Sequence, residues 1–178
     1  LNVAQLQPSV QIHNSFFGGS VDINNNIAVV GAYGDNTDGW RSGSVSIYTK
    51  KNTNEWIFSN TIRQSTFYNS LMNTPVQSGY FGFSLSISDD FIAIGAPSDK
   101  SNGTVFIFHS KNWENLNSID SYYIKGSNKF GFSVDINNNN KLVIGSPGEN
   151  GVSGKAVIYH IDSLFDEKTG FVSPQITN

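Results

Sequence analysis

The sequence has no cysteine and few charged residues, and these shortages exclude several classes of protein. Without cysteine, a disulfide framework or a thiolate metal site is ruled out. Only 14% of the 178 residues are charged and the formal net charge is −3, so we expect no basic patch for nucleic acid or an anionic membrane. No apolar run approaches the roughly 18 residues that span a membrane. We therefore expect no nucleic-acid partner and no membrane insertion.

What the sequence does contain is one pattern that occurs three times. Each copy begins with Phe-Gly and a short alternating run, and then has a turn and a second apolar run that closes at a glycine. The copies begin at Phe17, Phe81 and Phe130 and close at Gly31, Gly95 and Gly145. An internal repeat decides the architecture before any local propensity does.

Each copy predicts a tight hairpin of two strands. The apolar positions alternate over residues 21–23, 85–87 and 134–136, which is typical of a strand with one buried face. The second runs are apolar at consecutive positions, which is typical of strands covered on both faces. Asn, Asp and Ser lie between the two runs and favour turns, and the closing glycine is expected to end the second strand. We expect Ile94, Ile107 and Ile144 to be fully buried between neighbouring units.

Two further elements complete each unit. A third strand is predicted after another glycine, over residues 43–48, 103–108 and 154–159, and a weaker fourth lies within Trp56–Ile62, Trp113–Ile124 and Phe171–Ile176. Four antiparallel strands in a repeated unit are typical of a β-propeller blade. The predicted fold is therefore all-β, with about three blades that are part of a larger propeller or of an assembly.

The motif resembles the FG-GAP repeat of integrin α-subunit propellers and of many bacterial surface proteins. The Phe-Gly pair is present in all three copies, and the Gly-Ala-Pro segment is intact at Gly95-Ala96-Pro97 and altered at Gly31-Ala32-Tyr33 and Gly145-Ser146-Pro147. The resemblance implies a non-enzymatic binding or adhesion module, extracellular or surface-exposed, whose loops contact a protein or glycan. The alternative is a structural subunit of a coat, fibre or virion-like assembly, whose partners would be further blades or subunits.

Residues 1–178 are expected to form a single FG-GAP propeller segment. Residues 1–15 would hold an outer strand of a preceding blade, at Val3–Leu6. The blades are predicted at 16–63, 80–125 and 126–178, with an inserted loop at 64–79. Because propellers typically close with about four to eight blades, we expect further blades in a longer chain or in another subunit.

The first hairpin of each copy is a candidate metal site, because integrin-type repeats bind calcium there. The candidate ligands are Asp22, Asn24 and Asn26 in the first copy, and Asp135, Asn137 and Asn139 in the third. These loops are short and lack a later carboxylate, so they offer fewer oxygens than Ca²⁺ requires. We expect structural turns and no cofactor, with calcium as the weaker alternative.

No pattern of catalytic residues is recognised. The sequence has neither a Gly-x-Ser-x-Gly elbow nor a His-x-x-x-His pair nor a phosphate-binding glycine loop. His109 and His160 fall at the same repeat position, which favours a packing role, and His13 stands alone before the first copy. The sequence therefore predicts a protein that is not an enzyme.

The loop that follows the second strand of the first copy is longer than its counterparts, and binding residues concentrate in such loops on rigid scaffolds. The candidate binding residues in it are Asp35, Asp38, Trp40 and Arg41. Trp40 would stack on a ligand. Most other aromatic residues recur at equivalent positions, among them Tyr48 with Phe108 and Phe83 with Phe132, and are predicted to lie in the blade cores.

Overall fold

The structure is a computed structural model, which describes residues 4–52, 55–68, 77–99, 102–116, 119–148, 151–161, 164–166 and 170–171. Within these residues the strands form three antiparallel sheets of four, four and three strands, and a separate pair of short strands. The all-β prediction is confirmed.

The strands follow one another in each sheet in the order of the sequence. The first sheet consists of β1 (Phe17–Asn24), β2 (Ile27–Ala32), β3 (Ser44–Lys51) and β4 (Glu55–Arg63). The second consists of β5 (Ser84–Ile87), β6 (Phe91–Ala96), β7 (Thr104–His109) and β8 (Asp120–Lys125). The third consists of β9 (Ser133–Ile136), β10 (Lys141–Ser146) and β11 (Lys155–His160).

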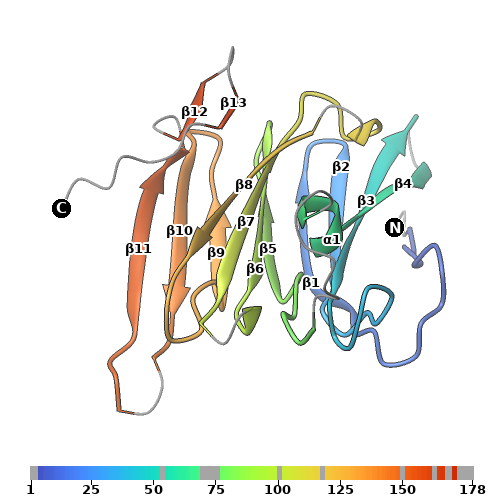
Figure 1. Cartoon of the computed structure of the whole chain (residues 1–178). Coiled ribbons are helices and arrows are strands. Elements are labelled where there is room, and N and C mark those ends of the chain that lie inside the picture. The colour runs from blue at the N-terminus through green and yellow to red at the C-terminus, as the bar shows by residue number, and fades with distance from the viewer. Residues whose placement is uncertain are drawn as a thin grey trace.

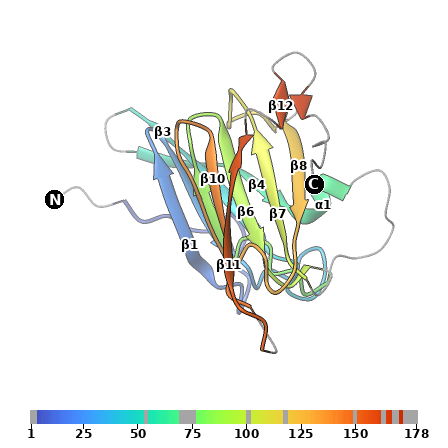
Figure 2. The same cartoon turned by 90° about the vertical axis from the view of Figure 1, so that its left-hand side faces the viewer.

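The sheets are placed side by side in sequence order, from the first sheet on the right of Figure 1 to the third on its left. Their first strands are neighbours, with β1 against β5 and β5 against β9. Figure 2 looks along the row from the third sheet and shows how the sheets overlap in this direction. Sheets of sequential antiparallel strands that meet at their first strands are propeller blades.

The hairpins between first and second strands are tight, as predicted. In the first sheet Asn24 pairs with Ile27, and Asn25 adopts a φ of 52°. In the third sheet Asn140 has a φ of 55° in the turn between β9 and β10. Asn tolerates this left-handed conformation better than most residues, so the Asn-rich stretches form the turns.

The hydrophobic core lies between neighbouring sheets rather than within one. Between the first two sheets, Val29, Val45 and Ile47 pack with Ile94 and a group of residues from the second sheet. Between the second and third, Ala93, Val105 and Ile107 pack with Leu142 and Ile144. The prediction for Ile94, Ile107 and Ile144 is confirmed, since each is 0% exposed.

The Phe-Gly pairs of the second and third sheets each attach their sheet to the preceding one. Phe81 and Phe130 are buried, and their backbone amides donate to the carbonyls of Ser42 (3.2 Å) and Asn102 (3.1 Å) in the preceding sheet's loop. The glycine that follows, Gly82 in the second sheet, has a φ of 85°, and a Cβ there would lie 2.6 Å from the Ser44 carbonyl oxygen. Only glycine fits both constraints.

The closing glycines of the second strands in the first two sheets are explained by the same contact. Gly31 and Gly95 lie inside β2 and β6 and pair in the ladder, so the expectation that they end these strands is wrong. A Cβ on Gly31 would meet the Gly82 carbonyl oxygen at 2.3 Å, and one on Gly95 would meet that of Gly131 at 2.1 Å. The repeated glycines therefore let adjacent sheets approach closely.

The predicted outer strand at Val3–Leu6 is wrong for the described residues, because residues 4–16 contain no strand. Instead Leu6 packs against Ala28, Val30 and Tyr48, and the Tyr48 hydroxyl donates to the backbone oxygen of Gln7. The segment thus covers β2 and β3, the middle strands of the first sheet, on the side where a preceding blade would lie.

The fourth strand predicted for the third blade also needs correction. Phe171 lies in β13 (Gly170–Phe171), which pairs with β12 (Phe165–Asp166) and not with β11. Residues 172–176 lie outside the described residues. In the inserted loop at 64–79, the structure has a short helix, α1 (Gln64–Tyr68).

Candidate binding surface

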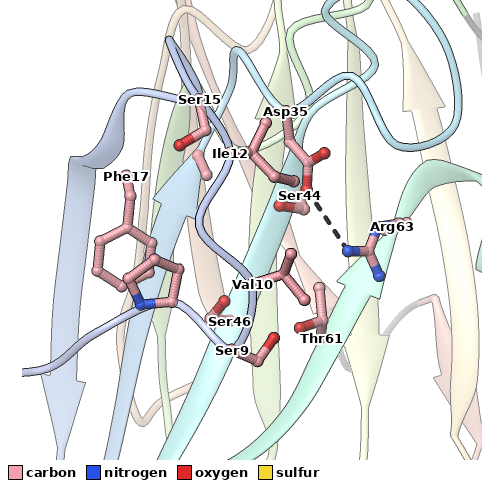
Figure 3. Close-up of a pocket in the computed structure, with 12 residues that line it drawn as sticks. Ser9, Val10, Ile12, Ser15, Phe17, Asp35, Ser44, Ser46, Thr61 and Arg63 are labelled. Carbon is pink, nitrogen blue, oxygen red and sulfur yellow. Dashed lines mark ion pairs between the residues drawn. The ribbon is translucent and has the colours of Figure 1, made fainter.

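Asp35 lies in the long loop between β2 and β3, but its side chain faces inward and is 3% exposed. Its Oδ1 accepts hydrogen bonds from the backbone amide (2.8 Å) and the hydroxyl (2.6 Å) of Thr37. Its Oδ2 lies 3.5 Å from a guanidinium nitrogen of Arg63 on β4. Figure 3 shows this ion pair beside Val10 and Ile12 of the N-terminal segment, so the carboxylate anchors the loop.

The contacts around Asp35 favour its ionised form. Burial alone would raise the pKa of this carboxyl, but the hydrogen bonds from Thr37 and Ser44 and the charge of Arg63 together hold the pKa below its usual value. A carboxyl whose pKa is lower in the folded state stabilises the fold above its unfolded pKa, and this contribution is lost as the pH falls through the folded value.

We predict that Asp35→Asn destabilises the protein at neutral pH by about 1–3 kcal/mol, the range for hydrogen bonds to charged groups. The difference between variant and parent should shrink as the pH falls below about 4, the usual pKa of an unfolded aspartate, and should be lost once the folded parent's carboxyl, whose pKa is lower, is protonated as well. Urea unfolding at several pH values measures both effects. A difference that stays constant from pH 7 to pH 2 would contradict this role.

The other three candidate binding residues of the loop, Asp38, Trp40 and Arg41, differ from Asp35 and from one another in their contacts and exposure. Asp38 accepts a hydrogen bond from Ser65 of α1. Trp40 is 59% exposed. The Arg41 guanidinium lies 5.2 Å from the centre of the Trp40 ring and 5.7 Å from that of Tyr80, and donates to the Tyr80 hydroxyl at 3.0 Å. The structure therefore brings Trp40 and Arg41 to the surface together.

Tyr80 belongs to a row of aromatic side chains at the sheet ends where the first strands begin. Phe16 stacks on Tyr33 with ring centres 4.8 Å apart, Tyr33 lies 6.2 Å from Tyr80 and 5.3 Å from Phe83, and Phe83 lies 4.9 Å from Phe132. We call these five residues, with Trp40 and Arg41, the aromatic surface. It crosses all three sheets.

The aromatic surface corrects one prediction and adds residues that the sequence did not indicate. Phe83 is half-buried and Phe132 is 42% exposed, so neither is a core residue, unlike Tyr48 and Phe108. Tyr33 was missed because the other copies have a proline, Pro97 or Pro147, at its position. Its stacking partner Phe16 was missed with it. The sequence did contain one signal of this surface, because an aromatic residue stands directly before Phe17 and another directly before Phe81.

Four of the six candidate metal ligands use their side chains in contacts within and between sheets. Asp22 Oδ2 accepts the amide of Ile87 and the hydroxyl of Ser86, each at 2.9 Å, and Ser86 also lies 3.1 Å from Asp135. Asn24 donates to Asp89. In the third hairpin, Asn137 Oδ1 accepts the amides of Asn139 and Lys141. Over the described residues, no three His, Asp or Glu side chains gather as a metal site would require.

We predict that calcium does not contribute to folding, because the hairpin side chains already bond to backbone and to the neighbouring sheet. Thermal unfolding in the presence of EDTA should give the same Tm as unfolding with millimolar calcium, with magnesium as the control ion. A rise of several degrees specific to calcium would show that one of these hairpins binds the ion.

His109 packs its ring with the centre 5.0 Å from that of Phe91. Burial, together with the charge of Lys111, lowers the pKa of this imidazole despite Asp90 and Asp120 nearby. Its Nδ1 lies 3.8 Å from an oxygen of Asp120. This arrangement fits the packing role expected at a strand end.

Stacked antiparallel sheets joined by Phe-Gly turns define the class of the protein as a propeller-type repeat protein. Residues 1–48 and 76–108 match the family model of the FG-GAP repeat. This match supports an FG-GAP repeat family for the chain, and the third sheet repeats the same motif beyond the matched residues. No curated protein matches the sequence.

Members of this family are generally non-enzymatic and generally mediate protein interactions. Within the described part of the chain, no helix has the length and apolar character needed to cross a membrane.

Proposed function

We propose that this protein is a non-enzymatic binding or adhesion module, located outside the cell or on a surface, that contacts a protein or glycan through the aromatic surface. The observation that carries the proposal is the half-exposed aromatic row beside Trp40 and Arg41. Exposed aromatic rings offer large apolar faces to the C–H faces of sugars or to apolar side chains at low entropic cost. FG-GAP repeats typically occur in extracellular proteins, which supports the location.

Arg41 gives the surface a polar and charged component. Among the described residues it makes no ion pair, and one of its nitrogens bonds to Tyr80. A guanidinium held between two rings is pre-organised, so its remaining donors can bind an oxygen-rich group. A ligand with both an apolar face and a carboxylate, sulfate or hydroxyl group fits this combination.

Binding to arrays of immobilised glycans and of cell-surface protein ectodomains tests the proposal. Trp40→Ala and Phe132→Ala should each weaken binding by at least about tenfold, the loss expected for an exposed aromatic contact at the centre of an interface. The matched control is Phe58→Ala on β4, which removes a ring of similar exposure, 41%, outside the aromatic surface. Equal loss in all three variants, or no loss in any, would contradict the proposal.

A further inference from the structure

Trp40 and Arg41 are held in place by backbone contacts on both sides of their loop. The backbone oxygen of Trp40 accepts the amide of Ser78 at 2.6 Å. That of Arg41 accepts the amide of Tyr80 at 3.1 Å. The Arg41 amide in turn donates to Asn36 Oδ1 at 2.7 Å. The loop therefore presents both side chains from a fixed backbone, and a site built in this way loses little conformational freedom when a ligand binds.

Arg41 and Tyr80 form a pair that keeps hydrogen-bond donors for a ligand. Both have a left-handed backbone, with φ of 48° and 54°, which bulky residues rarely adopt and which is often retained at ligand sites. Arg41 Nη1 donates to the Tyr80 hydroxyl at 3.0 Å. Because that oxygen accepts from Arg41, the hydroxyl can still donate its own proton, and the guanidinium carries further N–H groups. An oxyanion beside the pair can accept from both residues.

We call Trp40, Arg41 and Tyr80 the Arg41 group, and it lies where the first sheet meets the second. Trp40 and Arg41 come shortly before β3, and Tyr80 comes shortly before β5. A parallel bridge between Gly43 and Phe81 joins these two segments. Both adjoining sheets are described, and Trp40 is nevertheless 59% exposed. The group is therefore open to solvent at a completed junction between sheets.

The sheet end that carries the aromatic surface is positively charged in the described part of the chain, although the whole sequence has a net charge of −3. The acidic residues at this end are Asp35 and Asp99, each 3% exposed, and Asp38, which bonds to Ser65. Strand register and loop position place five cations at the same end: Arg41, Arg63, Lys125, Lys129 and Lys155. The opposite end carries the acidic residues Glu55, Asp89, Asp90, Glu114 and Asp120. An anionic ligand is attracted to the aromatic surface by this charge distribution.

We propose that the Arg41 group binds the carboxylate or sulfate groups of an acidic polysaccharide. This inference rests on the proposed function and names the ligand class of that surface. The Arg41 guanidinium and the Tyr80 hydroxyl donate to the oxyanion, while Trp40 and the neighbouring rings contact the apolar C–H faces of adjacent sugars. A sugar chain is favoured over an acidic peptide because each acidic sugar combines a charged group with an apolar face. The surface likewise combines cations with rings across all three sheets.

Binding of the full chain to three immobilised polymers tests the proposal. Hyaluronan offers carboxylates, dextran sulfate offers sulfates, and dextran is the neutral polymer. We expect at least about tenfold tighter binding to one of the acidic polymers than to dextran, and the preferred polymer identifies the oxyanion. This binding should weaken as NaCl is raised from about 50 mM to about 500 mM, because salt screens exposed charges.

Variants of the Arg41 group separate a specific site from general attraction between charges. Arg41→Gln should weaken binding to the preferred polymer by at least about tenfold, the loss expected for hydrogen bonds to a charged group. Tyr80→Phe keeps the ring and should cost about threefold or more. Arg41→Lys keeps the charge but lacks the planar fork, so it should recover only part of the affinity. The matched control is Lys141→Gln, which removes an exposed charge at the opposite sheet end and should change binding by less than about twofold.

Several results would overturn the proposal. They are binding to dextran as tight as to both acidic polymers, no binding to either acidic polymer, and equal losses in Arg41→Gln and Lys141→Gln. Tighter binding to polyglutamate than to either acidic polysaccharide would make an acidic protein segment the ligand instead.

Failure of this inference can be told apart from failure of the proposed function. If Trp40→Ala and Phe132→Ala weaken binding to a neutral glycan or a protein ectodomain and Arg41→Gln does not, the aromatic surface binds a ligand without an anionic group. If the two aromatic variants weaken binding to no ligand at all, the proposed function fails as well.

Discussion

Replacing Gly95 by alanine is expected to destabilise the protein by about 3 kcal/mol or more, at the upper end of the range for overpacked cores. The new Cβ would lie 2.1 Å from the Gly131 carbonyl oxygen and 2.2 Å from Ser84 Oγ. The carbonyl is backbone and is fixed by its own hydrogen bond with Ser84, so the two sheets would have to separate. Chemical denaturation measures the loss.

Gly145→Ala is the matched control for this substitution. Gly145 occupies the same repeat position in the third sheet, but its added Cβ would meet a side-chain oxygen that can rotate away. We expect a cost below about 1 kcal/mol. Similar losses at Gly95 and Gly145 would show that the glycine is required by the strand itself and not by contact between sheets.

Ile107→Ala is expected to cost about 2–5 kcal/mol, because it leaves a cavity between the second and third sheets. Ile94→Ala should behave alike at the interface of the first two sheets. The free energy of unfolding from urea titrations checks both values. A loss well below 1 kcal/mol for either substitution would contradict the placement of these side chains between blades.

Ile158→Ala is the control for Ile107→Ala, since the two residues occupy equivalent positions on β11 and β7. Ile158 is 65% exposed in the chain, so its truncation should change stability by no more than about 0.5 kcal/mol. Comparing the stability losses of the two variants tests the effect of burial directly, because the residue type and the position in the repeat are the same.

The strands and the buried isoleucines could be predicted because the sequence repeats its own pattern. Alternating and continuous apolar runs predicted β1, β2 and their counterparts, and the prediction was supported by three copies of the pattern in register. The role of Gly31 and Gly95 could not be predicted in this way. Within one copy, a glycine after an apolar run predicts the end of a strand. The glycine is instead required by a carbonyl that lies 51 residues further along the chain for Gly31 and 36 residues further for Gly95.

The N-terminal segment and the binding loop were harder to predict for different reasons. Residues 4–16 carry no strand pattern of their own, and Leu6 is held by Tyr48 and its neighbours in the first sheet. Asp35 looked like a ligand because it lies in a polar loop. Its burial depends on Arg63, which is brought to it by strand pairing across the first sheet.

The aromatic surface could be predicted only in part. Trp40 and Arg41 were recognised because they lie in a loop that departs from the repeat. Phe83 and Phe132 follow the repeat and were therefore assigned to the core, although recurrence shows equivalence of position and not burial. Both lie at the sheet ends and are at least partly exposed, so regularity alone does not separate core from surface.

The central claim is that neighbouring sheets are joined by one repeated contact, and amide hydrogen exchange at the junctions tests it most directly. The amides of Phe81 and Phe130 donate to Ser42 and Asn102 of the preceding sheet, and those of Ile87 and Ile136 donate to Asp22 and Ser86. Measured by NMR, all four should exchange as slowly as the central amides of β6, through opening of the whole fold. Exchange of these four amides at the rate of an unprotected peptide, with β6 still protected, would contradict the account.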